Sequence, residues 1–372
     1  MEIQFVDLKR QYMLHRLEID EAIKQVIEET AFISGKYANL FEKEFAQLYG
    51  VDHCISTANG TDSLYIIMKC LGIGSEDEVI TVSNSWISSS ETISQTGAKP
   101  VFIDIEEGTH SIDYKQIQNK ITSKTKALLM VHLHGQMCQI DEIEKLAKDN
   151  NLYLIEDCAQ SHFSALNGKK AGTFGIAGSF SFYPGKNLGA YGDAGCIITN
   201  DENLAKKCRK YANHGSLKKH EHEIEGINSR MDGIQANILR VKLKYIQEWT
   251  DLRIHSAKKY IELLKNLEFE GKLLTPKIRE NSIHTFHVFQ IECESRDALK
   301  LFLENHGINT ALHYPKPLPL LKCYEYLNLK DEDYKVNIEK SKKILSLPIF
   351  PEITEEEINY TISKIKEFYN QH

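Results

Sequence analysis

Five short runs of apolar residues, each about the length of a buried strand, recur between residues 78 and 184 of this chain. In chain order they are EVITVSN (78–84), KPVFIDI (99–105), KALLMVHLHG (126–135), LYLIEDCA (152–159) and AGSFSFYP (177–184). Amphipathic stretches such as DEIEKLAKDNN separate several of them. Apolar strands that alternate with helices are typical of a parallel sheet covered on both faces. The pattern predicts an α/β fold with a mainly parallel central sheet flanked by helices.

Longer periodic segments precede and follow these strands. Residues 15–30 and 38–50 are expected to be helices, and residues 53–74 to be a strand that turns into a helix. Residues 229–267 have a helical pattern of unusual length, and we expect a break in it near Arg253.

The C-terminal part alternates strand and helix in a different order, through HTFHVFQIEC, RDALKLFLENHG and TALHYP. A chain of 372 residues also exceeds the size at which a single core usually divides. We therefore predict a large α/β domain over residues 1–250 and a smaller α+β domain over residues 251–372.

The composition is that of an ordinary globular protein, with 42% hydrophobic and 26% charged residues. A formal net charge of −7 gives no electrostatic reason to expect nucleic acid as a partner. The eight cysteines are scattered without CxxC spacing, which favours reduced thiols. The N-terminus, MEIQFVDLKRQY, does not resemble a signal peptide, and no apolar stretch is long enough to span a bilayer. We expect a cytoplasmic protein with no membrane partner.

Candidate chemistry gathers where three of the predicted strands end, which is where ligands of such sheets bind. In chain order the groups are NGTD (59–62), Asp157 followed by Gln160, and Ser181 followed by Lys186. A strand that turns through glycine into a helix leaves free N–H groups, which suit a phosphate. Lys186 lies in SFYPGKNLGAYGDAG, a tight aromatic turn in which an amine can become nucleophilic. A phosphate cradle, a carboxylate and an amine together suggest pyridoxal 5′-phosphate.

Each of these features also has an ordinary structural explanation. A Gly-Thr pair often forms a simple turn and cap, a strand-end aspartate often caps a helix, and a single lysine is usually solvated. Trp86, in SNSWISSS, is either a core residue or the cover of a flat ring. His132 and His134 share one face of a strand, but no third ligand lies nearby in the sequence, so we expect no metal site.

The order of these motifs resembles the DegT/DnrJ/StrS group of sugar aminotransferases, within the aspartate aminotransferase fold. The resemblance extends over essentially the whole chain. It is carried by FVDLKRQY, CISTANGTDSL, VHLHGQ, IEDCAQSHFSALNGKKAGTFG, SFSFYPGKNLGAYGDAGCIITND, NHGS, GINSRMDGIQANIL and HYPKPLP.

The resemblance implies roles for individual cofactor-binding residues. Lys186 matches the Schiff-base lysine of the family, Asp157 the acid that keeps the pyridine nitrogen protonated, and Gln160 the partner of the ring hydroxyl. The residues that match the phosphate cradle are Gly60, Thr61 and Ser181, and Trp86 matches an aromatic ring stacked on the cofactor.

The resemblance also implies a homodimer with shared active sites. Asn228 matches a side chain that the other subunit donates to the phosphate. Arg230, His313 and Tyr314 match contacts to the nucleotide-sugar in some members.

The function expected from this resemblance is transfer of an amino group from L-glutamate to a keto-deoxysugar linked to dTDP or UDP. GINSRMD with ALHYPKPLP favours C3′ over C4′, and the product would be an amino sugar of a surface polysaccharide such as O-antigen. One alternative is the dehydratase branch of the family, but that branch has histidine at the position of Lys186. Another is a member of the fold that binds the cofactor without catalysis, as a regulator or scaffold.

Overall fold

The computed structural model describes residues 1–371, and its centre is a seven-stranded sheet. The strand order is β1-β9-β8-β5-β4-β2-β3. The run from β8 to β3 is parallel, whereas β9 is antiparallel to both of its neighbours. The strands are β1 (His53–Thr57), β2 (Glu78–Val82), β3 (Lys99–Ile103), β4 (Thr125–Val131), β5 (Tyr153–Asp157), β8 (Ala177–Ser181) and β9 (Gly195–Thr199). The predicted fold class, a mainly parallel sheet flanked by helices, is confirmed.

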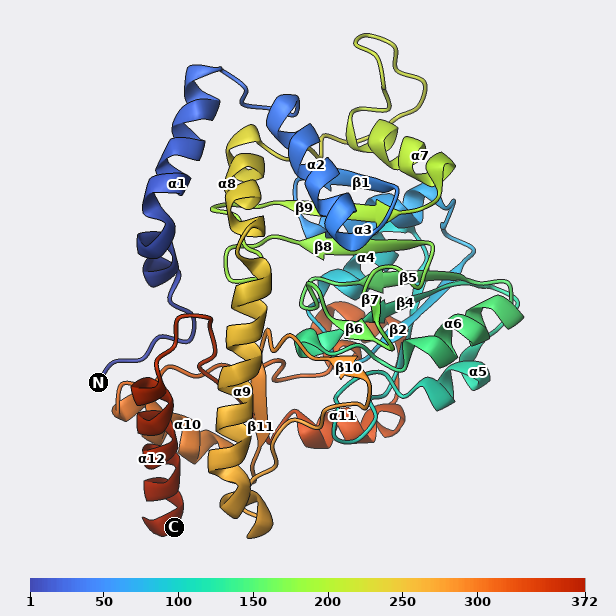
Figure 1. The fold of residues 1–372 in the computed structure, drawn as a ribbon. Coiled ribbons are helices and arrows are strands. Elements are labelled where there is room, and N and C mark those ends of the chain that lie inside the picture. The colour runs from blue at the N-terminus through green and yellow to red at the C-terminus, as the bar shows by residue number, and fades with distance from the viewer. Residues whose placement is uncertain (372) are drawn as a thin grey trace.

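Helices from the first two thirds of the chain surround this sheet, and the first of them packs against the last rather than against the strands (Figure 1). They are α1 (Leu8–Glu28), α2 (Lys36–Tyr49), α3 (Gly60–Cys70), α4 (Ser88–Thr96), α5 (Ile117–Lys120), α6 (Ile140–Asp149), α7 (Glu202–Ala212) and α8 (Gly233–Leu243). Local sequence explains several boundaries: Asn59 caps α3 through the N–H of Asp62, and Gly50 ends α2 in a left-handed conformation with φ of 71°.

The C-terminal part contains a two-stranded sheet with helices beside it. Its elements are α9 (Ile246–Phe269), β11 (Phe289–Glu292), α10 (Arg296–Asn305), α11 (Lys335–Lys340), β12 (Ile344–Leu347) and α12 (Glu355–Gln371). Three two-residue strands, β6 (Ala165–Leu166), β7 (Lys169–Lys170) and β10 (Ser282–Ile283), form a further small sheet. The expected break near Arg253 is wrong, because helix α8 ends at Leu243 and α9 starts at Ile246. Arg253 instead lies buried within α9, where it donates to the carbonyls of Phe286 and Ile349.

Two large apolar clusters underlie these parts. The first unites the central sheet with its helices, and the second unites α9, α10 and α12 with β11 and β12. Ile3 belongs to the second cluster, and its N–H donates to Gly307 O at 2.8 Å. Conversely, Leu318 and Tyr324 of the C-terminal part pack with Phe102 of β3 in the central sheet. The domain boundary at residues 250 and 251 therefore stays a prediction, with contacts that cross it in both directions.

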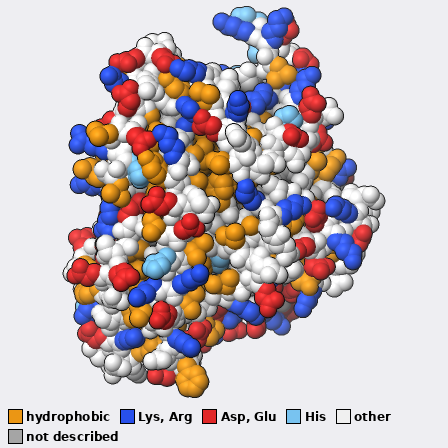
Figure 2. Space-filling model, in the orientation of Figure 1, with side chains coloured by type: hydrophobic (Ala, Val, Ile, Leu, Met, Phe, Trp, Pro, Cys, Tyr) orange, Lys and Arg blue, Asp and Glu red, His pale blue; other side chains and the backbone are white. Residues whose placement is uncertain are grey.

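One face of the molecule carries charges of both signs. On the face shown in Figure 2, basic and acidic side chains are interspersed. Among the helices of residues 1–371, none combines the length and apolar character that crossing a bilayer requires.

Candidate active site

The loops that follow β1, β5 and β8 leave the central sheet on the same side, at the carboxyl ends of these strands. Strands β5 and β8 are parallel neighbours, with Asp157 opposite Ser179, and β1 runs in the same direction as β8 because β9 is antiparallel to both. The β1–α3 turn and β8 also touch: a Cβ added to Gly60 would lie 2.7 Å from the Cβ of Ser181. Only glycine permits this close approach. The structure thus brings together the groups that the sequence placed at separate strand ends.

Lys186 lies in a closed turn after β8. Its N–H donates to Tyr183 O at 2.8 Å, and the N–H of Ala190 donates to Phe182 O at 2.7 Å. Gly189 packs so tightly that a Cβ would lie 2.2 Å from Pro184 O. Burial lowers the pKa of Lys186 to about 8, and the charge of Asp157 opposes this shift. An amine with this pKa is a better nucleophile at neutral pH than an ordinary lysine.

Asp157 and Gln160 lie beside this amine. Asp157 is 6% exposed, and its Oδ1 accepts a hydrogen bond from Ala159 N at 3.1 Å. Burial raises the pKa of Asp157, while the charge of Lys186 acts in the opposite direction. Gln160 accepts from the N–H of His134 and donates to the hydroxyl of Tyr314, both at 2.9 Å. These bonds hold the Gln160 amide in a defined orientation.

The N-terminus of α3 provides donors for an anion. The first turn of a helix has N–H groups without intrahelical acceptors, and Asn59 caps only that of Asp62. The N–H groups of Gly60 and Thr61 are therefore available, next to the hydroxyl of Ser181. The Oγ1 of Thr61 shares a hydrogen bond with Ser88 Oγ at 2.7 Å. This arrangement suits a phosphate.

Tyr314 connects two of the predicted residues to Gln160, because its ring contacts those of Trp86 and His313 and its hydroxyl accepts from the Gln160 amide. Trp86 is 62% exposed, and its ring centroid is 6.0 Å from that of Tyr314. It is therefore not a core residue of this chain. His313 shares a hydrogen bond with Ser346 at 2.8 Å, and burial and the charge of Lys186 lower the pKa of His313 to about 4. His313 is neutral at physiological pH.

Asn228 and Arg230 lie in the segment that precedes α8. Asn228 is exposed and forms an antiparallel bridge with Asn213, whose Oδ1 accepts from Arg230 Nη1 at 3.3 Å. The neighbouring hydroxyl of Ser229 accepts from Ala58 N at 3.1 Å, so this segment also contacts the β1–α3 turn of its own chain. The subunit that the Asn228 side chain serves stays a prediction.

The sequence reasoning overlooked Glu156, a fully buried carboxylate next to Asp157. Its oxygens accept from the N–H groups of Gly172, Phe174 and Gly175, and Oε2 lies 2.9 Å from His132 Nε2. A charged residue inside the apolar run LYLIED is the signal that could have indicated this network.

Among residues 1–371, His132 and His134 do not belong to one group of metal-ligating side chains. Instead, His132 lies with Glu156 and Cys158 in a buried group whose ligand atoms are within 4.8 Å of one another. Burial raises the pKa of the Cys158 thiol well above its usual value, and the oxygens of Glu156 are already occupied by backbone donors. We therefore interpret this group as a structural network.

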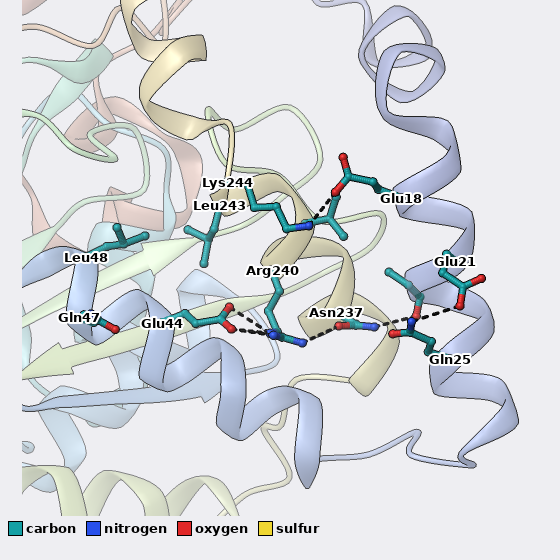
Figure 3. A pocket seen from close by; sticks show the side chains of 12 residues that line it. Glu18, Glu21, Gln25, Glu44, Gln47, Leu48, Asn237, Arg240, Leu243 and Lys244 are labelled. Atoms are coloured by element: carbon teal, nitrogen blue, oxygen red, sulfur yellow. Dashed lines mark hydrogen bonds and ion pairs between the residues drawn. The ribbon is translucent and has the colours of Figure 1, made fainter.

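A cavity of about 750 Å³ lies between α1, α2 and α8. Four of its charged side chains form two ion pairs, Arg240 with Glu44 and Lys244 with Glu18, and Glu21 accepts from Gln25 (Figure 3). It contains none of the predicted site residues.

The fold, with an amine, a carboxylate and a helix N-terminus suited to a phosphate at one edge of the sheet, is typical of the class of pyridoxal-phosphate-dependent aminotransferases. A family model described as the DegT/DnrJ/EryC1/StrS aminotransferase family matches residues 14–366, and the chain belongs to this family. Its members depend on pyridoxal phosphate, and the protein is a sugar aminotransferase enzyme.

Two curated relatives match nearly the full length. One, named "Pleiotropic regulatory protein", from Geobacillus stearothermophilus, is 41% identical, over 99% of this chain and 99% of that one. The other, from Aneurinibacillus thermoaerophilus, is 39% identical, over 98% of this chain and 99% of its own. It is named dTDP-3-amino-3,6-dideoxy-alpha-D-galactopyranose transaminase.

Two solved structures are similar to this chain over nearly its whole length. DesV of S. venezuelae superimposes with a TM-score of 0.95 at 35% identity, covering 99% of this chain and 98% of that chain. The ntda protein of Bacillus subtilis, with bound cofactor pmp, gives 0.91 at 31% identity, covering 98% and 85%.

The residues of this chain fit the cofactor. A nearly buried carboxylate, Asp157, accepts only one hydrogen bond within residues 1–371, so it can accept another from a protonated ring nitrogen. An amine of lowered pKa lies beside it, and the Gly60–Ser181 contact closes a cradle that a Cβ would fill.

Proposed function

We propose that this enzyme transfers an amino group from L-glutamate to a keto-deoxysugar linked to dTDP or UDP, with C3′ favoured over C4′. The observation that carries the proposal is the Lys186 amine, whose pKa burial lowers to about 8, beside the buried carboxylate of Asp157. The 39% identical relative, named as a dTDP-3-amino sugar transaminase, supports a nucleotide-linked substrate and C3′.

The roles of the residues follow from their positions. When bound, pyridoxal phosphate supplies an aldehyde that exchanges amino groups and a ring that withdraws electrons. Lys186 would hold the cofactor and, once released by the amino donor, move a proton at the substrate carbon. Asp157 would keep the ring nitrogen protonated, and Gln160 would orient the ring hydroxyl. Gly60, Thr61 and Ser181 would bind the phosphate, and Trp86 would cover the ring.

The opening of the site would receive the nucleotide-sugar. Arg230, His313 and Tyr314 would contact it. Tyr314 accepts from the Gln160 amide, and the neutral imidazole of His313 can donate a hydrogen bond to sugar hydroxyls or accept one from them. We place the enzyme in the cytoplasm, in the biosynthesis of an amino sugar for a surface polysaccharide.

A homodimer with shared sites completes this proposal. The exposed Asn228 would donate to the phosphate of the other subunit, so that each chain alone has an incomplete site. Mixing Lys186→Ala chains with Asn228→Ala chains would place both lesions in one site and leave the other intact. Isolated heterodimers should regain up to about half the activity of a wild-type dimer. Activity no higher than that of the parent homodimers would assign Asn228 to its own subunit or remove it from catalysis.

The relative named as a regulatory protein makes a non-catalytic role the second candidate. Lys186 decides between the two, because a regulator does not require an amine in the cofactor turn. We expect the purified protein to absorb in the visible, the spectrum to change on addition of L-glutamate, and Lys186→Ala to abolish transamination. A spectrum that does not respond to glutamate would favour the regulatory role.

The substrate is identified with a panel of dTDP- and UDP-linked 3-keto and 4-keto sugars, each incubated with glutamate and analysed by mass spectrometry. We expect an amine product from a 3-keto sugar. Turnover of only the 4-keto sugars would overturn the preference for C3′, and no turnover of any sugar would overturn the substrate class.

A further inference from the structure

Within residues 1–371, Lys242 of α8 is a buried lysine with no carboxylate at ion-pair distance, although the charge of Glu352 partly opposes the effect of burial on its pKa. The residue is 1% exposed, although lysines are almost never buried unless they are paired. Its ammonium forms no ion pair within residues 1–371; Nζ donates to Gly189 O at 2.7 Å and lies 4.3 Å from the ring centroid of Tyr191. Burial lowers the pKa of Lys242 to about 8. Burying an ammonium group without an ion pair costs free energy. The two contacts of Lys242 therefore indicate which part of the structure it stabilises.

Both contacts of Lys242 belong to the turn that carries Lys186. Gly189 follows Lys186 by three residues, inside the loop that the bond from Ala190 to Phe182 closes. Because Gly189 also packs directly on Pro184, its carbonyl moves with the turn as a whole. A donor that fixes this carbonyl therefore restricts the position of the Lys186 backbone.

A second side chain of the same helix holds the turn. Gln235 accepts from the N–H of Tyr191 at 2.8 Å, and it lies seven residues, about two helical turns, before Lys242. Helix α8 stands next to the ends of β8 and β9 in Figure 1. On the other side of the turn, Asn187 donates to Thr285 O at 3.0 Å. The turn is thus held between α8 and a segment that precedes β11.

We propose that Lys242 is a positioning residue for Lys186: its ammonium fixes the carbonyl of Gly189 and so holds the reactive amine in place at the sheet edge. This inference rests on the proposed function of Lys186. It assigns a part in positioning that residue to helix α8. Lys242 acts through the turn and contacts no reacting atom.

The test compares Lys242→Met with Lys244→Met. Lys244 is the C-cap residue of α8, two residues after Lys242, but it points toward α1 and pairs with Glu18 (Figure 3). Two measurements use the full-length chain without cofactor: amide hydrogen exchange of residues 183–190, and labelling of Lys186 by an acylating reagent, followed by mass spectrometry. The third is kcat and KM of the holoenzyme.

For Lys242→Met we expect faster exchange in the turn, altered labelling of Lys186, and a kcat lowered about tenfold, as expected for loss of one charged hydrogen bond. The KM for the sugar should stay within about twofold, because the sugar-binding residues are untouched. Lys244→Met should behave as wild type in all three measurements.

Wild-type exchange and labelling in Lys242→Met would overturn the proposal, as would equal effects from Lys244→Met. If Lys242→Met does not fold, Lys242→Gln, which is one bond shorter and uncharged, is judged by the same measurements. A failure of the proposed function is recognised separately, because it would appear as transamination by Lys186→Ala, whereas exchange of the turn reports on Lys242 alone.

Discussion

Replacing Lys186 by methionine should make the cofactor-free protein more stable at neutral pH, although it removes the reactive group. The pKa of Lys186 is about 8 in the folded chain and 10.5 as an ordinary lysine. Below pH 8 both the folded and the unfolded chain carry the charge, and the folded state bears the whole cost of burying it. Between pH 8 and 10.5 the unfolded chain binds more protons, so stability rises with pH. Above pH 10.5 the cost is gone.

The size of the effect follows from this difference. At about 1.4 kcal/mol for each pH unit, the shift corresponds to about 3 kcal/mol at pH 7. Because the side chain keeps partial exposure, solvent screening reduces this figure, and we expect a gain of about 2 kcal/mol for Lys186→Met. The gain arises because the functional amine is held in an unfavourable environment.

The assay is urea unfolding of cofactor-free wild type and Lys186→Met at several pH values between 7 and 10. Lys258→Met, an exposed lysine of α9, is the matched control and should change the free energy of unfolding by less than about 0.5 kcal/mol. If Lys186→Met were no more stable than wild type at pH 7, or if its gain did not shrink as the pH rises, the electrostatic account of the turn would be wrong.

Three further substitutions test other parts of the site. Asp157→Asn should retain cofactor but lose about a hundredfold or more in kcat, since an amide cannot keep the ring nitrogen protonated; circular dichroism and turnover check this, and near-normal turnover would contradict it. Gly60→Ala should weaken cofactor binding by about tenfold or more in a spectral titration, because its Cβ would lie 2.7 Å from that of Ser181. The control Gly74→Ala, whose Cβ would have nothing within 4 Å, should bind the cofactor normally. Glu156→Gln should lower the free energy of unfolding by about 3 kcal/mol, because its amide would oppose backbone donors; an unchanged urea midpoint would refute this.

The sequence by itself determined the parallel sheet and the three strand ends that carry the chemistry. Burial on both faces leaves continuous apolar runs, and the turns after them depend on residues within a few positions, as at Asn59 and the closed loop around Lys186. Such features are local, so the pattern predicts them. The resemblance to a known family added roles to these residues, and membership of that family is confirmed.

Tertiary structure decided the features that depend on residues far apart in the chain. Arg253 lies buried within α9, where it donates to carbonyls 33 and 96 positions away, and no local pattern contains these partners. Glu156 is tolerated in a buried strand only because the chain returns with the N–H groups of Gly172, Phe174 and Gly175. Likewise, Ile3 joins the C-terminal core, and its N–H donates to Gly307 O. Burial of apolar surface and pairing of buried polar groups both depend on proximity in space, and only the fold creates that proximity.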